Sequence, residues 1–144
     1  MNEEIIKVIK TMFAGADERD WNKAGSVMHT SVLLDYSSMN GNPAQALSPQ
    51  EITGAWAAFL PGFDKTHHQL SNFTITEEGD TASASYSGKA DHYIGNEVWV
   101  VDGSYDVQLQ RQQSRWLITA LKFNFTSQAG NTELPKLAIE KLKK

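Results

Sequence analysis

Histidine is the side chain best suited to move protons at neutral pH, because its unperturbed pKa lies near ~6.5. The chain contains four histidines: His29, His67, His68 and His92. His29 lies at the end of a predicted short helix, where an imidazolium can stabilise the helix terminus without any catalytic role. His67 and His68 are adjacent on a predicted strand, so one points into the domain and the other away. The spacing leaves open which of the two faces inward.

His92 lies on a predicted strand whose alternate positions mostly carry small side chains. The residues that share its face are Ala82, Ala84, Tyr86, Gly88 and Ala90. Such a face can border a cavity that binds a small molecule, or it can be filled by a large side chain from a helix. A proton-transfer site and a packed core are therefore both compatible with His92.

Other catalytic and binding chemistries lack their motifs. The chain has no cysteine, which excludes disulfides, thiolate metal sites and cysteine nucleophiles. The histidines show no HxH, HExxH or HxxxH spacing, and two adjacent histidines cannot ligate one ion from one face of a strand. There is no GxSxG nucleophile elbow and no glycine-rich phosphate loop. We therefore expect neither a metal nor a cofactor.

Length and charge limit the domain organisation and the partners. The 144 residues are 40% apolar and 21% charged, which suits one folded domain over residues 1–144. The net charge of −4 has the wrong sign for a broad nucleic-acid surface, so we expect no nucleic-acid partner. No segment approaches the ~20 apolar residues of a membrane span, and the start of the chain lacks the pattern of a signal peptide. We expect a cytoplasmic protein without a membrane partner.

Three N-terminal helices are predicted to position the candidate residues. The first has apolar residues at helical spacing, namely Ile5, Ile6, Ile9, Met12, Phe13 and Ala16. Asp20 can cap a short second helix. Ser48 and Glu51 form a capping box around a proline, which predicts the start of a third helix that ends at Pro61-Gly62.

A strand is predicted to end at Tyr36, and the second half of the chain changes to extended segments. These cover residues 66–76, 81–93, 97–111 and 115–126. The last of them is apolar on both faces, which is typical of a central strand. Residues 130–144 are predicted to form a separate short helix. Helices followed by long antiparallel strands indicate an α+β fold with the helices on one face of the sheet.

Five short motifs occur in an order that resembles the nuclear transport factor 2-like superfamily, and most closely its SnoaL-like and scytalone dehydratase-like branch. They are Asp17-Glu18-Arg19-Asp20-Trp21, Leu34-Asp35-Tyr36, Thr66-His67-His68, Ala90-Asp91-His92 and Arg115-Trp116. The likeness covers residues 3–126. It implies a cone-shaped, cystatin-like α+β fold in which a curved antiparallel sheet wraps the N-terminal helices and encloses an apolar pocket. Members of this superfamily dehydrate, isomerise or cyclise ring ketones and polyketides, hydrolyse epoxides, or only bind and assemble.

The resemblance carries four site residues over from scytalone dehydratase. Asp17 stands in the place of its aspartate and Tyr36 in the place of its tyrosine. His68 and His92 stand in the places of its first and second histidines. The chain departs from that enzyme at Ala16, where the enzyme has a second tyrosine that orients water on the substrate carbonyl. It also departs near Asp106, where the enzyme has an asparagine.

These four residues would supply a base, an acid and a donor to an oxyanion. We expect His68 to remove a proton next to a carbonyl while the Tyr36 hydroxyl donates to the developing oxyanion. Asp17 is expected to accept a ring N–H of His92, which would then protonate a leaving hydroxyl. Each residue also has a structural alternative: a helix cap for Asp17, a core phenol for Tyr36 and packed imidazoles for the histidines.

The sequence therefore predicts a cofactor-free dehydratase or isomerase that acts on a small hydrophobic cyclic or polyketide-like ketone. A homodimer or higher homo-oligomer is expected. Two alternatives stay open, a non-catalytic protein that binds a small molecule and a dimeric interaction module of the same fold. They differ in whether the candidate side chains converge on one site.

Overall fold

The computed structural model describes residues 2–143, so the first and last residues of the predicted 1–144 domain lie outside the described part. The elements in chain order are α1 (Asn2–Glu18), α2 (Trp21–Gly25), β1 (Met28–Asp35), α3 (Ser37–Asn40), β2 (Gln45–Leu47), α4 (Pro49–Ala57), the 3₁₀ turn η1 (Leu60–Gly62), β3 (Lys65–Glu78), β4 (Thr81–Ile94), β5 (Glu97–Gln112), β6 (Arg115–Gly130) and α5 (Leu134–Leu142). The four long predicted strands are confirmed. The helix predicted over residues 130–144 is shorter, because β6 extends to Gly130 and α5 covers Leu134–Leu142.

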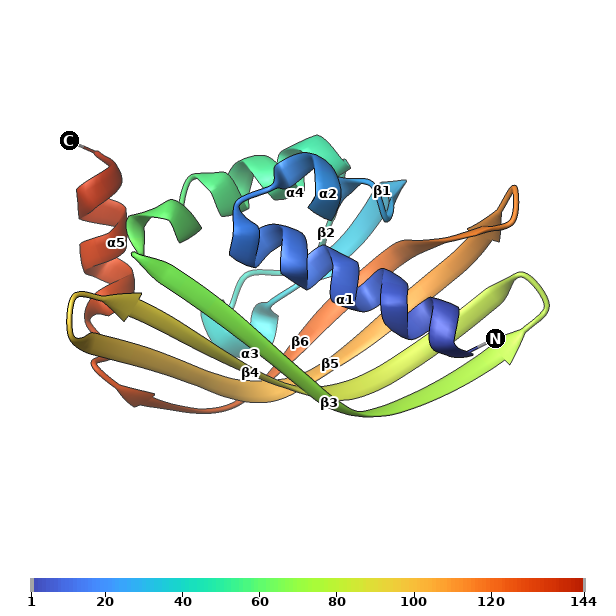
Figure 1. The fold of residues 1–144 in the computed structure, drawn as a ribbon. Coiled ribbons are helices and arrows are strands. Elements are labelled where there is room, and N and C mark those ends of the chain that lie inside the picture. The colour runs from blue at the N-terminus through green and yellow to red at the C-terminus, as the bar shows by residue number, and fades with distance from the viewer. Residues whose placement is uncertain (1, 144) are drawn as a thin grey trace.

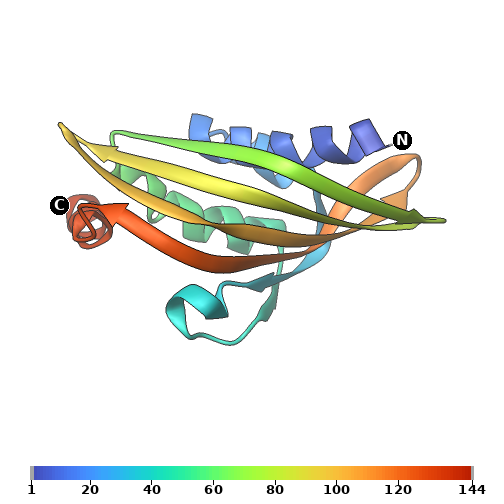
Figure 2. The same cartoon turned by 90° about the horizontal axis from the view of Figure 1, so that it is seen from below.

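One curved, open sheet forms the base of the fold, and helices cover its concave side (Figure 1). The strand order is β2-β1-β6-β5-β4-β3. The last four strands of the chain form an antiparallel meander, while β1 pairs parallel with β6. β6 therefore lies inside the sheet, as its apolar residues on both faces predict. Figure 2 shows α3 and α5 at the margins of the sheet. The α+β class and the wrapped sheet are thus as expected.

Helix α1 packs on the sheet through the apolar stripe that the sequence predicts. Ile5, Ile9 and Met12 are fully buried, and the ring of Phe13 is 5% exposed. The helix ends at Glu18, and the Asp20 side chain caps α2 by accepting from the backbone N–H of Lys23. Because α1 runs beside β3, its last turn lies against the start of that strand.

The predicted capping box begins α4. The Ser48 hydroxyl accepts from the backbone N–H of Glu51, and the Glu51 carboxylate accepts from the backbone N–H of Ser48. The helix ends at Ala57, and Pro61 lies in the short turn η1 that follows. This turn leads directly into β3 and brings its backbone carbonyls close to the end of α1.

The prediction for His29 was wrong, because this residue lies in β1 and not at the end of a helix. Met28 and Val32 are both buried, and a spacing of four residues fits either a helix or a strand. Gly25 ends α2 after five residues, so Met28 and the residues after it are extended. The His29 ring lies beside the side chain of Gln112 near the tip of the last hairpin.

Candidate active site

A carboxylate at the end of α1 forms two hydrogen-bond contacts with a histidine on β3. The Asp17 Oδ1 atom lies 2.6 Å from the Nδ1 atom of His68, and Asp17 Oδ2 accepts from the backbone N–H of His68 at 2.8 Å. The side chains are mostly buried, with 18% of Asp17 and 12% of His68 exposed. Two contacts from one carboxylate fix both the position and the orientation of the imidazole.

This contact also decides which ring nitrogen of His68 carries the proton. Burial alone would raise the pKa of Asp17, but the hydrogen bonds from His68 and Thr66 outweigh it and hold the pKa below the usual 3.8. The carboxylate is therefore ionised at neutral pH and can only accept. Nδ1 must donate to it, so in the neutral imidazole the lone pair lies on Nε2.

Strand alternation shows which of the two adjacent histidines faces inward. Thr66, which is buried, and His68, which is mostly buried, lie on the inner face of β3, while His67 is exposed on the outer face. The aromatic ring of Phe13 lies over the imidazole of His68, with 5.0 Å between the ring centres. His68 thus lies beneath α1, at the edge of the core.

Arg19 and Thr66 complete the contact, although neither was predicted as a site residue. The Arg19 guanidinium donates to the Thr66 hydroxyl oxygen at 2.8 Å and to the backbone carbonyl of Leu60 at 2.8 Å. The Thr66 hydroxyl in turn donates to Asp17 Oδ1 at 3.0 Å. Both residues stand inside the quoted motifs, two positions from Asp17 and from His68. Their closeness in sequence to Asp17 and His68 was the signal that could have identified them as site residues.

The expected contact between Asp17 and His92 is not formed. β3 lies at the edge of the sheet beside α1, whereas His92 lies on β4, one strand further from Asp17. His92 Nδ1 is 3.1 Å from the backbone carbonyl of Trp99, and since a carbonyl only accepts, this nitrogen carries the proton. The ring is enclosed by those of Trp99 and Phe63, at 4.4 and 4.9 Å between centres.

Burial also changes the chemistry expected of His92. With 5% of the residue exposed, desolvation lowers its pKa to about 4. The imidazole is therefore neutral at neutral pH, with Nδ1–H donated and Nε2 carrying a lone pair. A side chain in this state accepts a hydrogen bond but has no acidic proton for a leaving group, so the expected role as a charged acid does not suit it.

Tyr36 follows directly after β1 and reaches the same side of the sheet. Its ring packs against Phe123, with 6.0 Å between centres, and burial raises its pKa to about 12. The hydroxyl is therefore protonated at neutral pH and can donate. Burial raises the pKa of Tyr105, and negative charge on Tyr36 or Asp17 would raise it further. The phenol of Tyr105 therefore lies near both groups.

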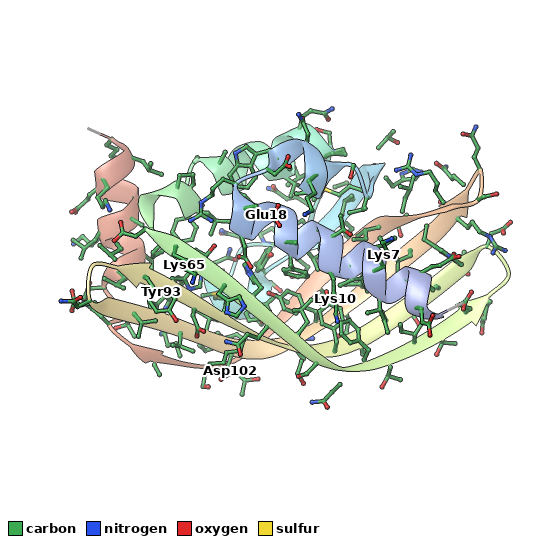
Figure 3. All side chains as sticks on the ribbon, viewed as in Figure 1. Lys7, Lys10, Glu18, Lys65, Tyr93 and Asp102 are labelled. Atoms are coloured by element: carbon green, nitrogen blue, oxygen red, sulfur yellow. The ribbon has the colours of Figure 1, made fainter. Side chains whose placement is uncertain are left out.

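Aromatic rings occupy the space over the small residues of β4. The Tyr105 ring lies against Gly88, where a Cβ atom would come 2.4 Å from Tyr105 Cε2. Figure 3 shows side chains between the ribbon of α1 and that of the sheet. Two surface hollows of about 370 and 380 Å³ lie elsewhere, near Arg111 and beside Lys10, and no candidate residue lines either of them.

Two departures from scytalone dehydratase have different consequences. Ala16 is buried at the end of α1, and its carbonyl accepts from the Arg19 guanidinium, so the missing phenol concerns the site directly. Asp106 is exposed on the outer face of β5, where it binds Ser85 and Asn124, away from His68.

Among residues 2–143, no three His, Cys, Asp or Glu side chains gather as ligands for one ion. No helix in this part of the chain has the length and apolarity to cross a bilayer.

Comparison with known families identifies the fold. The sequence model of the SnoaL-like domain matches residues 2–122. The chain belongs to the SnoaL-like family. This match confirms the resemblance drawn from the five motifs. No curated protein sequence matches this SnoaL-like chain significantly.

Solved structures with the same fold include several named for elimination reactions. The Kfla4162 protein of Kribbella flavida has a TM-score of 0.88 at 23% identity, over 94% of this chain and 96% of that one. A candidate scytalone dehydratase of Novosphingobium aromaticivorans has 0.76 at 13%, over 90% and 86%. The hexachlorocyclohexane dehydrochlorinase LinA-type3 of Novosphingobium barchaimii has 0.72 at 12%, over 91% and 90%. At these identities the likeness establishes the fold of the SnoaL-like chain.

Proposed function

We propose that this SnoaL-like protein is a cofactor-free acid–base enzyme of the dehydratase or isomerase type, acting on a small hydrophobic ring ketone. The observation that carries the proposal is the 2.6 Å contact between Asp17 and His68, which leaves Nε2 of His68 free as a base. Two structural neighbours have names that denote the loss of water or of hydrogen chloride, and both reactions need a base to remove a proton from carbon.

The proposed reaction is an elimination. His68 Nε2 removes a proton from the carbon next to the carbonyl, and the electron pair of that C–H bond becomes a C=C bond. The C–O bond to a hydroxyl on the next carbon breaks, and the His68 imidazolium returns its proton to this hydroxyl, which leaves as water. In an isomerisation, the same proton returns to a different carbon. Asp17 stabilises the imidazolium that forms in between.

Tyr36 and His92 have supporting roles in this proposal. The hydroxyl of Tyr36, whose pKa is raised to about 12, donates a hydrogen bond to the carbonyl oxygen as negative charge develops there. The neutral ring of His92 accepts a hydrogen bond from the departing hydroxyl through Nε2 and so orients it. The proton for that hydroxyl comes from His68.

A direct test uses 3-hydroxy-1-tetralone, which loses water and becomes 1-naphthol. Purified protein is mixed with this ketone, and the absorbance of 1-naphthol is followed. We expect turnover by the wild type and a loss of at least about 100-fold in His68→Gln. His67→Gln is the matched control, because this neighbouring imidazole is exposed on the opposite face. Equal rates for wild type and His68→Gln would refute the assignment of the base.

A binding protein without turnover is the second candidate. It is favoured by the tight packing of Phe13 on His68, at 5.0 Å between ring centres, and by the alanine at position 16. In that case 3-hydroxy-1-tetralone would bind to the wild type and to His68→Gln with similar affinity, and no naphthol would form with either protein.

A further inference from the structure

One asparagine of the chain is followed by a glycine, at Asn40-Gly41. Asn40 is the exposed last residue of α3, and Gly41 ends this helix with a backbone φ of 76°. A Cβ atom built on Gly41 would meet nothing within 4 Å, so no neighbouring group crowds this position. The backbone nitrogen of a glycine is also unhindered by a side chain of its own residue. The pair therefore places a side-chain amide next to an unhindered backbone nitrogen in an exposed turn.

The side-chain carbonyl of Asn40 is polarised by a backbone donor. Its Oδ1 atom accepts from the backbone N–H of Asn42 at 2.9 Å. A hydrogen bond to this oxygen draws electrons away from Cγ, and it stabilises the negative charge that the oxygen gains when a nucleophile attacks that carbon. The turn thus activates Asn40 in the way that an oxyanion hole activates a substrate carbonyl.

A single helical turn opposes the approach of the Gly41 nitrogen to Cγ of Asn40. The Gly41 N–H donates to the carbonyl of Ser37 at 2.9 Å, and this bond must open before the nitrogen can attack. α3 has four residues, and among the described residues no side chain caps its start. The Ser38 hydroxyl ties the first half of the helix to two backbone groups of β6 and leaves the end free. Because one turn of helix has little stability of its own, we expect this end to open often.

We propose that Asn40 is a site of spontaneous deamidation in the folded protein. The backbone nitrogen of Gly41 loses its proton and attacks Cγ of Asn40. The bond from Cγ to Nδ2 breaks, the amide leaves with a proton as ammonia, and a five-membered succinimide ring remains. Water then adds to one of the two ring carbonyl carbons, and the bond from that carbon to the ring nitrogen breaks. Opening at Cγ gives aspartate, and opening at the main-chain carbon gives isoaspartate. Water is the only co-reactant.

The reaction adds a charge to a segment that has none. No residue between Asp35 and Glu51 is acidic or basic. The new carboxylate would lie at the C-terminal end of α3, where negative charge is unfavourable, and isoaspartate would also lengthen the backbone. The carbonyl of Tyr36 accepts from the N–H groups of Met39 and Asn40, so the change reaches a residue of the proposed site. The modification itself does not depend on the proposed function.

Peptide mass spectrometry of the purified, folded protein tests the proposal. Samples are taken during incubation in mildly alkaline buffer, and the mass of each peptide that contains an asparagine is followed. We expect Asn40 to deamidate at least about tenfold faster than any other asparagine, because Asn40 alone precedes a glycine. Asn42 is the internal control in the same turn, since Pro43 follows it and has no N–H to lose. The rate should rise with pH, because the attacking nitrogen must lose its proton.

Two variants identify the product. Asn40→Asp should co-elute with an acidic form that accumulates on anion-exchange chromatography of the incubated wild type. Asn40→Gln keeps an amide but moves it one carbon away from the backbone, so that ring closure is slower. This variant should form no acidic species over the same period.

Two results would overturn the proposal. One is a mass gain at Asn22, Asn96 or Asn131 that is as fast as the gain at Asn40. The other is an unchanged Asn40 in the folded protein over a period in which the chain unfolded in urea loses this amide completely. That result would mean that α3 holds the Gly41 nitrogen away from Cγ. Neither measurement involves turnover, so both are separate from the test of the proposed function.

Discussion

At the scale of single residues, the carboxylate of Asp17 decides the protonation pattern of the site. It accepts from both the ring and the backbone of His68, so the two residues act as one unit. An isolated imidazole exchanges its proton between both ring nitrogens, whereas this contact selects one of them. The basic nitrogen of His68 is therefore set by a residue 51 positions earlier in the chain.

Replacing Asp17 with asparagine should separate the effect of its charge on His68 from the effect of its packing. Asp17→Asn keeps the size of the side chain but removes the charge that stabilises an imidazolium, so we expect turnover of 3-hydroxy-1-tetralone to fall about 100-fold or more. Asp20→Asn, three residues away, keeps a good cap for α2 and should retain wild-type turnover. Steady-state rates of the two variants make the comparison. A similar rate for both would argue against a role of Asp17 in the reaction.

His92 should make the stability of the protein depend on pH in a defined window. Its pKa is lowered from 6.5 to about 4 by burial. Above pH 6.5 the ring is neutral in both folded and unfolded chains, but between pH 6.5 and about 4 the unfolded chain binds the proton first. The free energy of unfolding should therefore decrease as the pH is lowered through this window, by up to about 3 kcal/mol.

Urea denaturation at pH 7 and pH 4.5 measures this effect. His92→Gln should show a smaller fall than the wild type, and His67→Gln should behave like the wild type. The carboxyl groups of Asp17 and Asp106 have pKa values below 3.8, so their contribution to stability is lost only at lower pH. An equal fall in His92→Gln and wild type would contradict the assigned state of His92.

At the scale of elements, the end of α1, the turn η1 and the start of β3 are joined by one side chain. Arg19 has a backbone φ of 60°, which is unusual for a residue with a side chain, and its guanidinium contacts all three elements. Through Thr66 it fixes the hydroxyl that donates to Asp17. The position of the proposed base therefore depends on a junction of three elements.

Thr66→Val tests this junction, because valine has the shape of threonine without the hydroxyl. Asp17 would lose one donor and Arg19 one acceptor, so we expect turnover to fall roughly tenfold and stability to fall by about 1–2 kcal/mol. Thr76→Val on the exposed face of the same strand is the control and should change neither quantity. Turnover and urea denaturation check the two effects. Unchanged turnover in Thr66→Val would show that the junction does not act on the site.

The contact between β4 and β5 requires a glycine at position 88. A Cβ atom there would lie 2.4 Å from the Tyr105 ring, which is held in a stack with Tyr86, so Gly88→Ala should destabilise the fold by about 1–3 kcal/mol. Gly54→Ala is the counterpart, because its Cβ atom meets nothing within 4 Å in helix α4. This control should stabilise by about 0.5–1 kcal/mol. Similar effects of both changes in thermal unfolding would contradict the tight packing at Tyr105.

At the scale of the whole molecule, local patterns predicted the elements well but not every contact between them. The period of α1, the capping box at Ser48 and the four long strands depend on neighbouring residues, and all were found as expected. The pairing of Asp17 depends on which strand α1 lies beside. The order of the motifs carries no such information. His92 on β4 was therefore predicted as the partner of Asp17, whereas the partner is His68 on β3.

The aromatic filling of the site depends on the tertiary fold in the same way. The small residues of β4 showed that space is left over that strand, but whether Tyr105 or a ligand takes it depends on β5. Arg19 and Thr66 stood within the motifs and were missed because their contacts join α1, η1 and β3. Homo-oligomer formation stays a prediction that light scattering after size-exclusion chromatography can check, with a monomer as the contradicting result.

The protonation pattern of His68 tests the central claim most directly. Nitrogen-15 NMR of labelled protein, at a pH where the imidazole is neutral, distinguishes a protonated ring nitrogen from one with a lone pair. We predict that Nδ1 of His68 is protonated and Nε2 is not, and that Asp17→Asn lets the proton populate both nitrogens. A wild-type His68 with the proton on Nε2, or shared equally between the nitrogens, would contradict the account.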